Sequence, residues 1–436
     1  MTPFHILVVG SGGREHALAW RLAEDAHRPH IHVAPGNDAM ARAFTRHAVA
    51  ETDVEAMLAL ARRIGAELVV VGPETALAAG LADALSAAGI PVFGPSRAAA
   101  RIESSKWFAK EVMREAGVPT ARAAAYERAP EALAALNAFA PPWVVKADGL
   151  AAGKGVCVTA ALAEAQAFVR ECFAPGGFGG EGERRVVLEE FLPGEEASVM
   201  AVCDGERFVL LPAARDYKRA RDGDQGPNTG GMGSYAPTPV VDAAIEREVG
   251  ERVVRPVLRV LAARGTPFRG ALYCGLMLGE GGVQVVEYNA RFGDPESQSI
   301  LPLVAGDFTR LLFGAATGAL APDAVRTRPG AAVTVALVDE GYPDAVRRTG
   351  TITGLDTLAA TAGVLVFHAG TGQAAGDWAV RGGRAAYVTA HDTHVEGARA
   401  KAYAAIARLG GTGWRVRADI AGARTQVGGS AAWQPS

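Results

Sequence analysis

Short apolar runs alternate with amphipathic segments over residues 1–102. Candidate strands lie at 6–9, 30–33, 68–71 and 91–93, and each ends at a glycine or proline turn. Strands that alternate with helical patterns are typical of a parallel sheet with covering helices. Because ligands bind beyond the carboxyl ends of the strands in such sheets, we expect the four turns to share one rim.

The pattern changes after residue 102. Residues 103–328 contain a strand–glycine loop–strand segment, a long mixed stretch and a second block of β runs. After a Pro-Gly break, candidate strands at 332–338, 364–368 and 385–389 precede a helix at 393–409. The patterns predict a multidomain α/β and α+β protein, with domains at 1–102, 103–328 and 329–425.

Composition narrows the class of protein. The chain has 436 residues, 49% of them hydrophobic, and a formal net charge of −3, which argues against a general affinity for nucleic acid. Its four cysteines are far apart, which is typical of reduced thiols rather than of a zinc site or a disulfide framework. The chain begins with a strand pattern and has no run long enough to span a membrane. We expect a cytoplasmic protein without membrane or nucleic-acid partners.

A glycine-rich loop at 143–158 carries the strongest local signal. Lys146 lies within a valine-rich strand, and Gly149, Gly153, Lys154 and Gly155 follow before a second strand pattern. Glycines and lysines together are suited to holding phosphates. The spacing excludes a P-loop, which needs four residues between its glycines and Ser or Thr after its lysine. The loop predicts a mobile hairpin flap over a nucleotide; a plain glycine turn with solvated lysines is the alternative.

The first strand–helix turn is a second candidate anion site. Gly12 and Gly13 precede a helix pattern, and Arg14 adds a positive charge. A dinucleotide fingerprint is disfavoured, because Glu15 replaces its third glycine and the second strand lacks the ribose-binding acid. A phosphate site is the favoured interpretation, and a tight structural turn is the alternative.

A third signal lies at the end of a strand near residue 289. Glu287 and Asn289 share one face by period-2 geometry, and Arg291 would share it if the strand continued. Oxygen ligands with room for water and phosphate suit Mg²⁺ bound to ATP. An acidic segment at 188–198 could contact adenine and ribose, although a solvated charge cluster is the commoner explanation of such a pattern. The basic, glycine-containing stretch at 215–233 resembles an active-site loop, although a solvent loop would share its composition.

These motifs together resemble the phosphoribosylamine–glycine ligase family of ATP-grasp enzymes. The resemblance follows nearly the whole chain in order, through 8–18, 71–74, 93–96, 105–106, 145–155, 226–233 and 287–296. It implies a Rossmann-like N-terminal domain, an ATP-grasp core with a mobile flap subdomain at about 120–192, and a small C-terminal cap domain. It also implies ATP-dependent joining of glycine to 5-phosphoribosylamine through glycyl phosphate, in purine biosynthesis.

The same resemblance implies roles for individual residues. ATP would be bound by Lys106, Lys146, Gly149, Gly153, Lys154, Gly155, Glu189, Glu190, Leu192 and Glu196. The phosphoribosyl substrate would contact Gly12, Gly13, Arg14 and Glu74, and Mg²⁺ or Mn²⁺ would be held by Glu287 and Asn289. Arg291, Asp294 and Asp216 would be catalytic or would bind glycine or the incoming amine.

Several properties remain open at this level. Many ATP-grasp enzymes carry another acid on the strand before the Glu-x-Asn pair, whereas 275–278 is apolar here, so the number of metal ions is undetermined. A monomer is expected, with a transient contact to the enzyme that supplies the labile amine. The alternatives are an ATP-grasp ligase for another carboxylate, a nicotinamide oxidoreductase and a nucleotide-binding regulatory protein with a decayed site.

Overall fold

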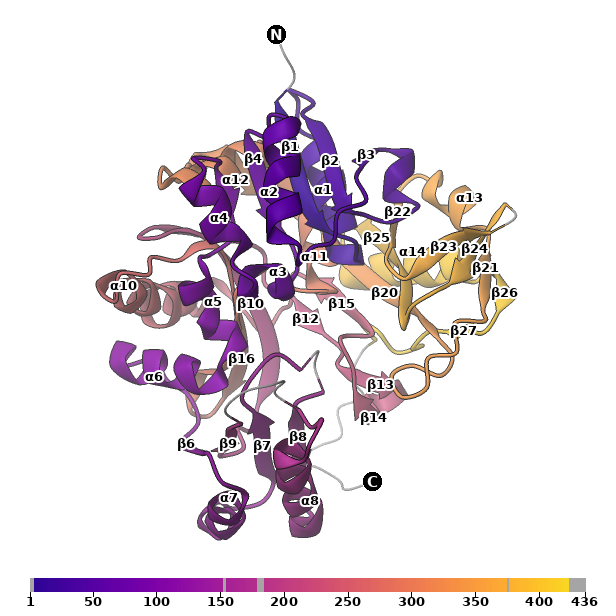
Figure 1. Ribbon diagram of the computed structural model, residues 1–436. Helices are drawn as coiled ribbons and strands as arrows, with labels where there is room; N and C mark the ends of the chain where they lie inside the picture. Colours follow the sequence, from indigo (N-terminus) through magenta and orange to yellow (C-terminus); the bar gives the residue numbers. More distant parts are fainter. Residues whose placement is uncertain (1–3, 152–153, 179–183, 375, 423–436) are drawn as a thin grey trace.

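The N-terminal part of the chain forms a five-stranded parallel sheet. The computed structural model describes residues 4–151, 154–178, 184–374 and 376–422 (Figure 1). The sheet has the strand order β3-β2-β1-β4-β5. Its strands are β1 (His5–Gly10), β2 (His30–Pro35), β3 (Thr45–Arg46), β4 (Leu68–Val71) and β5 (Val92–Phe93). The four strands expected from the sequence and their parallel arrangement are confirmed.

Alternating side chains of β1 enter two different cores. Ile6 and Val8 pack with residues of α1 (Gly13–Ala23), whereas Leu7 and Val9 pack with residues of α2 (Val54–Arg63). Because successive side chains of a strand point to opposite faces, a strand with helices on both sides must be apolar throughout. This explains the unbroken hydrophobic runs of β1 and β4, and it leaves the strand ends as the accessible edges.

Two antiparallel sheets form the middle of the chain. The flap sheet has the order β6-β9-β7-β8, with β6 (Ala123–Tyr126), β7 (Trp143–Ala147), β8 (Val156–Thr159) and β9 (Val186–Glu189). It has a separate small core with α7 (Ala129–Ala135) and α8 (Leu162–Phe173). The second sheet has the order β11-β10-β16-β17, with β10 (Glu195–Asp204), β11 (Phe208–Leu210), β16 (Arg269–Gly279) and β17 (Gly282–Asn289). The separate core makes the flap sheet a distinct packing unit.

The C-terminal sheet recruits strands from the middle of the chain. Its order is β12-β15-β20-β25-β22, with β12 (Arg215–Asp216), β15 (Gly233–Ala236), β20 (Ala331–Asp339), β25 (Arg384–Asp392) and β22 (Val364–His368). Gly233 of β15 pairs with Val335 of β20, and α14 (Val395–Ile406) follows β25. The predicted C-terminal strands and helix are present, but the sequence did not predict that 215–236 joins them.

The remaining elements complete the described structure. The helices are α3 (Glu74–Ala78), α4 (Leu81–Ala87), α5 (Arg97–Ser104), α6 (Lys106–Ala116), α9 (Ala243–Glu248), α10 (Arg255–Ala263), α11 (Glu296–Ile300), α12 (Phe308–Thr317) and α13 (Leu355–Ala359). The strands are β13 (Arg219–Arg221), β14 (Gln225–Asn228), β18 (Val304–Gly306), β19 (Val325–Thr327), β21 (Thr351–Thr353), β23 (Thr371–Ala374), β24 (Asp377–Val380), β26 (Gly410–Thr412) and β27 (Trp414–Arg415). Within the described ranges, every helix is too short or too polar to cross a membrane. The expected multidomain class, with an N-terminal parallel sheet and a C-terminal α+β part, is confirmed.

Candidate active site

A buried carboxylate joins the flap sheet to the rest of the site. Glu189 ends β9, and its two oxygens lie 3.0 Å from the Nζ atoms of Lys146 and Lys110. Lys146 also donates to the carbonyl oxygen of Val286 in β17, at 3.1 Å. Burial lowers the pKa of Lys110 to about 8, against the opposing effect of Glu189. The predicted nucleotide lysine is therefore held between two sheets, and Lys110 is a partner that the sequence did not reveal.

The base of the glycine loop is fastened to the start of α6. The carboxylate of Asp148 accepts hydrogen bonds from Ser105 Oγ and Trp107 N, both at 3.2 Å. Lys106, the first residue of α6, donates to Gly149 O at 2.7 Å. Burial lowers the pKa of Lys106 against the effect of nearby acids. These contacts place Lys106 beside the loop.

The loop itself requires glycine at defined points. Gly149 has φ of +141°, a conformation that side chains disfavour. A Cβ atom at Gly155 would lie 2.6 Å from Ala151 Cβ. Lys154 is exposed, whereas Gly153 lies outside the described residues. The hairpin expected between the two strands is thus present as β7 and β8, and Lys154 has its side chain in solvent.

The short segment between β9 and β10 connects the flap sheet to the second sheet. Glu190 is exposed and pairs with Arg122 Nε at 2.7 Å, and its amide donates to Arg122 O at 3.0 Å. Leu192 is half-buried in the same segment. A nucleotide bound between the two sheets would lie next to this segment. The predicted contact between the segment and adenine requires this position.

Cations surround the carboxylate at the end of β17. Glu287 pairs in register with Gly275 of β16, two residues before the strand ends at Asn289. Burial opposes its ionisation, but Lys218, Lys146, Lys106 and Arg291 together hold the pKa of Glu287 below its ordinary value. A carboxylate with four cationic neighbours is suited to a polyanionic ligand. The prediction that Glu287, Lys106 and Lys146 lie together is consistent with this geometry.

The donor atoms at this strand end suit a hard cation that arrives with phosphate. Glu287 offers a carboxylate and Asn289 an amide oxygen, and Mg²⁺ or Mn²⁺ accepts such oxygens together with phosphate and water. With two ligands from the protein, most coordination positions of the ion are left to phosphate and water. The cations around Glu287 agree with this, because they favour a phosphate-bearing substrate. The residues therefore fit a metal ion bound to a nucleotide better than a free one.

Arg291 connects the strand end to the N-terminal domain. It lies beyond the end of β17, yet its Nη2 is 3.5 Å from Asn289 Oδ1 and 2.9 Å from Glu103 Oε1, and its Nε is 3.3 Å from Glu74 Oε2. Glu74 is desolvated, but Arg291 and Arg14 lower its pKa to about 2. Burial raises the pKa of Glu103. The structure thus brings Glu74 and Arg14 beside the strand end of Glu287 and Asn289, and adds Glu103 to the site.

Glu15 occupies the space that a dinucleotide would need. Its Oε2 accepts from Gly12 N at 2.7 Å, and its Oε1 lies 2.5 Å from Arg14 Nε. A Cβ atom at Gly72 would lie only 2.1 Å from Glu15 Oε1. The carboxylate therefore fills the gap between the ends of β1 and β4 and accepts from the amide of Gly12, the residue that precedes α1. A Cβ atom at Gly13 would meet the Tyr387 ring at 2.3 Å, so the C-terminal domain packs against this turn.

A half-buried group of opposite charges lies near Glu287. Lys218 Nζ is 2.8 Å from Glu196 Oε2 and 3.8 Å from Asp216 Oδ1. Burial raises the pKa of Asp216 to about 7, a shift that Lys218 opposes and that Glu296 and Glu196 strengthen. The nearby acids, Asp216 foremost, raise the pKa of Lys218 although burial opposes this. Lys218 was not predicted as a site residue, because its role depends on β12 and β10 coming together.

The C-terminal domain supplies one more residue to the site. Arg384 of β25 donates from Nη2 to Asp294 Oδ2 and from Nη1 to Asp294 O, both at 2.9 Å. It also donates to the carbonyl oxygen of Gly230. Gln298 Nε2 donates to Asp294 Oδ1 at 2.7 Å. Asp294 is therefore oriented by two residues that sequence reasoning missed.

The flap sheet and the second antiparallel sheet meet at buried lysines and at the strand end that carries Glu287 and Asn289. This arrangement defines an enzyme of the ATP-grasp class. Family models for phosphoribosylglycinamide synthetase match its N domain at residues 4–103, its ATP-grasp (A) domain at 104–297 and its C domain at 332–423. The chain belongs to the phosphoribosylglycinamide synthetase family.

Individual relatives agree with this assignment. The phosphoribosylamine–glycine ligase of Streptomyces coelicolor is 50% identical over 420 residues, which span 95% of this chain and 98% of that protein. The enzyme of the same name from Caulobacter vibrioides is 47% identical over 96% of this chain and 98% of its own length. The crystal structure of phosphoribosylamine–glycine ligase from Thermotoga maritima superposes with a TM-score of 0.82 at 35% identity, covering 95% of this chain and all of that one.

A more distant structure shares the fold alone. The biotin carboxylase domain of Hydrogenobacter thermophilus 2-oxoglutarate carboxylase, solved with MgADP and bicarbonate, has a TM-score of 0.71 at 18% identity. It covers 94% of this chain and 91% of that one. The family model at 104–297 confirms the expected ATP-grasp domain.

Proposed function

We infer that the chain joins glycine to 5-phosphoribosylamine at the expense of ATP, giving glycinamide ribonucleotide, ADP and phosphate. The names of its relatives support the substrates. The observation that carries the inference is the half-buried Glu287 carboxylate ringed by Lys106, Lys146, Lys218 and Arg291. Such a ring stabilises a triphosphate with its metal ion and the charge that develops during phosphoryl transfer.

The reaction proceeds in two displacements. A glycine carboxylate oxygen attacks the γ-phosphorus of ATP, the bond to the bridging oxygen breaks, and ADP departs. The amine nitrogen of phosphoribosylamine then attacks the acyl carbon of glycyl phosphate, phosphate leaves, and the nitrogen loses a proton. The acyl phosphate is already activated, so the protein needs to position the reactants, stabilise charge and exclude water.

The nucleotide is held between the two sheets. Lys146 and Lys106 contact the phosphates, and the hairpin with Gly149 and Gly155 covers them. The segment at 189–192 borders the adenine, and Glu196 lies where ribose hydroxyls can donate to it. Glu287 and Asn289 would hold Mg²⁺ or Mn²⁺, which supplies neutralising charge to the phosphate oxygens.

The remaining substrates meet at the edge of the cation ring. Arg291 stabilises the transferred phosphoryl group, because its guanidinium is fixed by Glu74 and Glu103. The Asp216 carboxylate, in its ionised form, binds the ammonium group of glycine. The turn at 12–14 and Glu74 bind the phosphoribosyl group, and Asp294, oriented by Arg384, borders the incoming amine.

A phosphate-release assay tests this function. Phosphate should form from ATP and Mg²⁺ only when glycine and freshly generated phosphoribosylamine are both present. Replacing glycine with alanine, or omitting the amine, serves as the control. Release that does not depend on glycine, or on the amine, would refute the assignment.

A further inference from the structure

Four histidines lie on one face of the parallel sheet, at the edge away from the ligase site. His5 begins β1 and pairs in register with His30, the first residue of β2; His32 follows on the same face. His47 comes directly after β3, on the same side. About five residue steps of roughly 3.3 Å each separate His5 from Gly10 at the catalytic rim, or roughly 16 Å. The ligase reaction uses none of these side chains.

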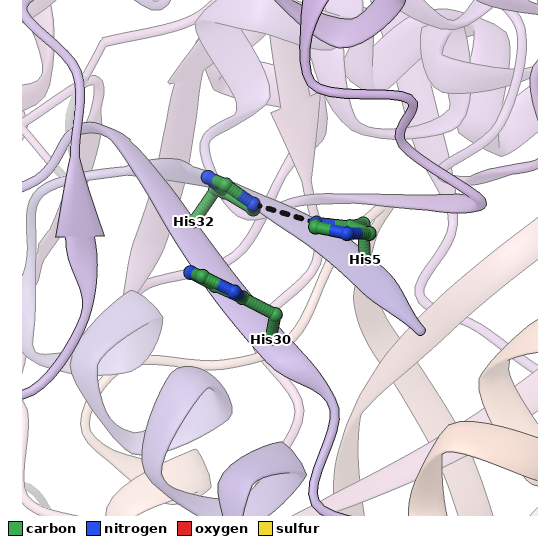
Figure 2. A group of neighbouring side chains, drawn as sticks. All are labelled: His5, His30 and His32. Carbon is green, nitrogen blue, oxygen red and sulfur yellow. Dashed lines mark hydrogen bonds between the residues drawn. The ribbon is translucent and has the colours of Figure 1, made fainter. Parts of the chain in front are cut away.

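The imidazole rings are packed closely, as Figure 2 shows. His5 Nδ1 lies 3.0 Å from His32 Nε2, and the rings of His30 and His32 stack with centroids 4.5 Å apart. One ring nitrogen from each of His5, His30 and His32 lies within 4.8 Å of the others. Three imidazoles, each with a nitrogen donor, therefore lie together on the sheet, and their planes differ by only 8° to 28°.

We propose that His5, His30 and His32 bind a divalent transition-metal ion of the class of Zn²⁺, Ni²⁺ and Cu²⁺. These ions prefer imidazole ligands, at metal–nitrogen distances of about 2.0–2.1 Å for zinc. Two nitrogens 3.0 Å apart subtend an angle of roughly 95° at an ion so placed. An opening of a few tenths of an ångström brings this pair to the tetrahedral angle, and the ring of His30, now stacked on His32, has to turn to direct its nitrogen at the same ion.

A second layer of contacts orients the ligands. His32 Nδ1 lies 3.0 Å from His47 Nε2, which leaves His32 Nε2 to face the ion. His30 Nε2 contacts Thr45 Oγ1 at 2.9 Å, so its Nδ1 remains for the ion. Metal-ligating histidines commonly use their other nitrogen in this way.

A second cluster in the described part of the chain lacks this freedom. Asp25, His27 and Asp307 also come within ligand distance of one another. However, Asp25 accepts hydrogen bonds from Arg21, Phe308 N and Thr309. Its oxygens hold the start of α12 in place, so an ion there would compete with existing structure. In the histidine cluster an ion would displace the contact between His5 and His32 and the stacking of the rings, neither of which holds a helix or strand in place.

The ion would tie β1 to β2 at their first residues. Because it binds the folded domain and not the unfolded chain, it stabilises the N-terminal sheet in proportion to its concentration above Kd. Its distance from the ligase site predicts no change in turnover. The site is therefore structural, and its test does not depend on the proposed reaction.

Calorimetric titration with Zn²⁺, in buffer saturated with Mg²⁺, tests the site. The intact protein should bind one ion and show a higher Tm. His5→Gln and His30→Gln should each weaken binding at least about tenfold and abolish the Tm increase. His30 is exposed, so this variant keeps the fold. His391→Gln, at an exposed histidine of β25, is the matched control and should bind as the intact protein does.

Co²⁺ provides a spectroscopic check on the ligands. The intact protein should give visible absorption bands that His30→Gln changes and His391→Gln does not. Absence of Zn²⁺ binding would overturn the proposal. Binding that persists in both ligand variants, or that Glu287→Gln removes instead, would also overturn it, because the ion would then lie elsewhere.

Discussion

Above pH 7, replacing Asp216 with asparagine should raise the free energy of unfolding and lower kcat/KM for glycine. The side chain is 8% exposed, and burial raises its pKa from 3.8 to about 7. This increase corresponds to roughly 4 kcal/mol against the ionised carboxylate. The folded protein holds this proton up to pH 7, whereas the unfolded chain releases it near pH 4. The stability contributed by the protonated form is therefore complete below pH 4 and lost as the pH rises through 7.

Asp216→Asn removes this loss of stability. The free energy of unfolding of the variant, relative to the intact protein, should rise by up to about 4 kcal/mol between pH 4 and 8. Lys218 retains Glu196 at 2.8 Å, so its charge keeps a partner. Urea unfolding at several pH values measures the difference. Asp344→Asn, at an exposed aspartate, is the control and should leave the pH dependence unchanged.

The same variant should impair the use of glycine. If the ionised carboxylate holds the glycine ammonium, kcat/KM for glycine in the intact enzyme should fall below pH 7, since this ratio reports the free enzyme. In Asp216→Asn the ratio should be low and flat across this range. Equal pH profiles of unfolding in both proteins, together with an unchanged KM for glycine, would refute the reasoning.

Three further substitutions test other parts of the site. Glu287→Gln should reduce turnover roughly 100- to 1,000-fold, because the metal ligand is weakened, and should lower the free energy of unfolding in urea, because four cations lose a carboxylate. Glu189→Gln should cost about 3–5 kcal/mol of unfolding free energy and weaken ATP binding measured by calorimetry, since two buried lysines lose their carboxylate. Arg384→Met should raise the KM for phosphoribosylamine and cost about 2–4 kcal/mol in urea unfolding, because Asp294 loses its cation. Arg381→Met, at an exposed arginine, is the control for the last substitution.

Distinct outcomes would contradict each of these expectations. Full activity in the Glu287 variant would remove the metal role from that residue. Unchanged stability and unchanged ATP affinity in the Glu189 variant would show that the lysine contacts contribute nothing. If the Arg384 and Arg381 variants changed the KM for phosphoribosylamine and the free energy of unfolding equally, Arg384 of the C-terminal domain would have no specific role in the site.

Local sequence pattern predicted the strands that are apolar and buried over most of their length. The residues of β4, β20 and β25 are of this kind, so the positions of these strands could be inferred. The strand end with Glu287 and Asn289 was equally accessible, because period-2 geometry alone puts both on one face. The exact domain boundaries remain a prediction.

Long-range pairing explains what the sequence did not reveal. Lys110, Lys218 and Arg384 are ordinary surface-type residues until a distant strand or helix supplies their acidic partners. The joining of 215–236 to the C-terminal sheet depends on register with β20, which no local pattern encodes. Conversely, Glu15 showed in the sequence only as a missing glycine, while the structure shows that it fills the space itself.

Transfer of heavy oxygen from glycine to phosphate tests the central claim most directly. The reaction would be run with ATP, Mg²⁺, phosphoribosylamine and glycine labelled in both carboxylate oxygens, and the released phosphate analysed by mass spectrometry. If the glycine carboxylate attacks the γ-phosphorus and the amine then breaks the acyl bond, each phosphate carries one labelled oxygen. Unlabelled phosphate formed together with product would contradict the account.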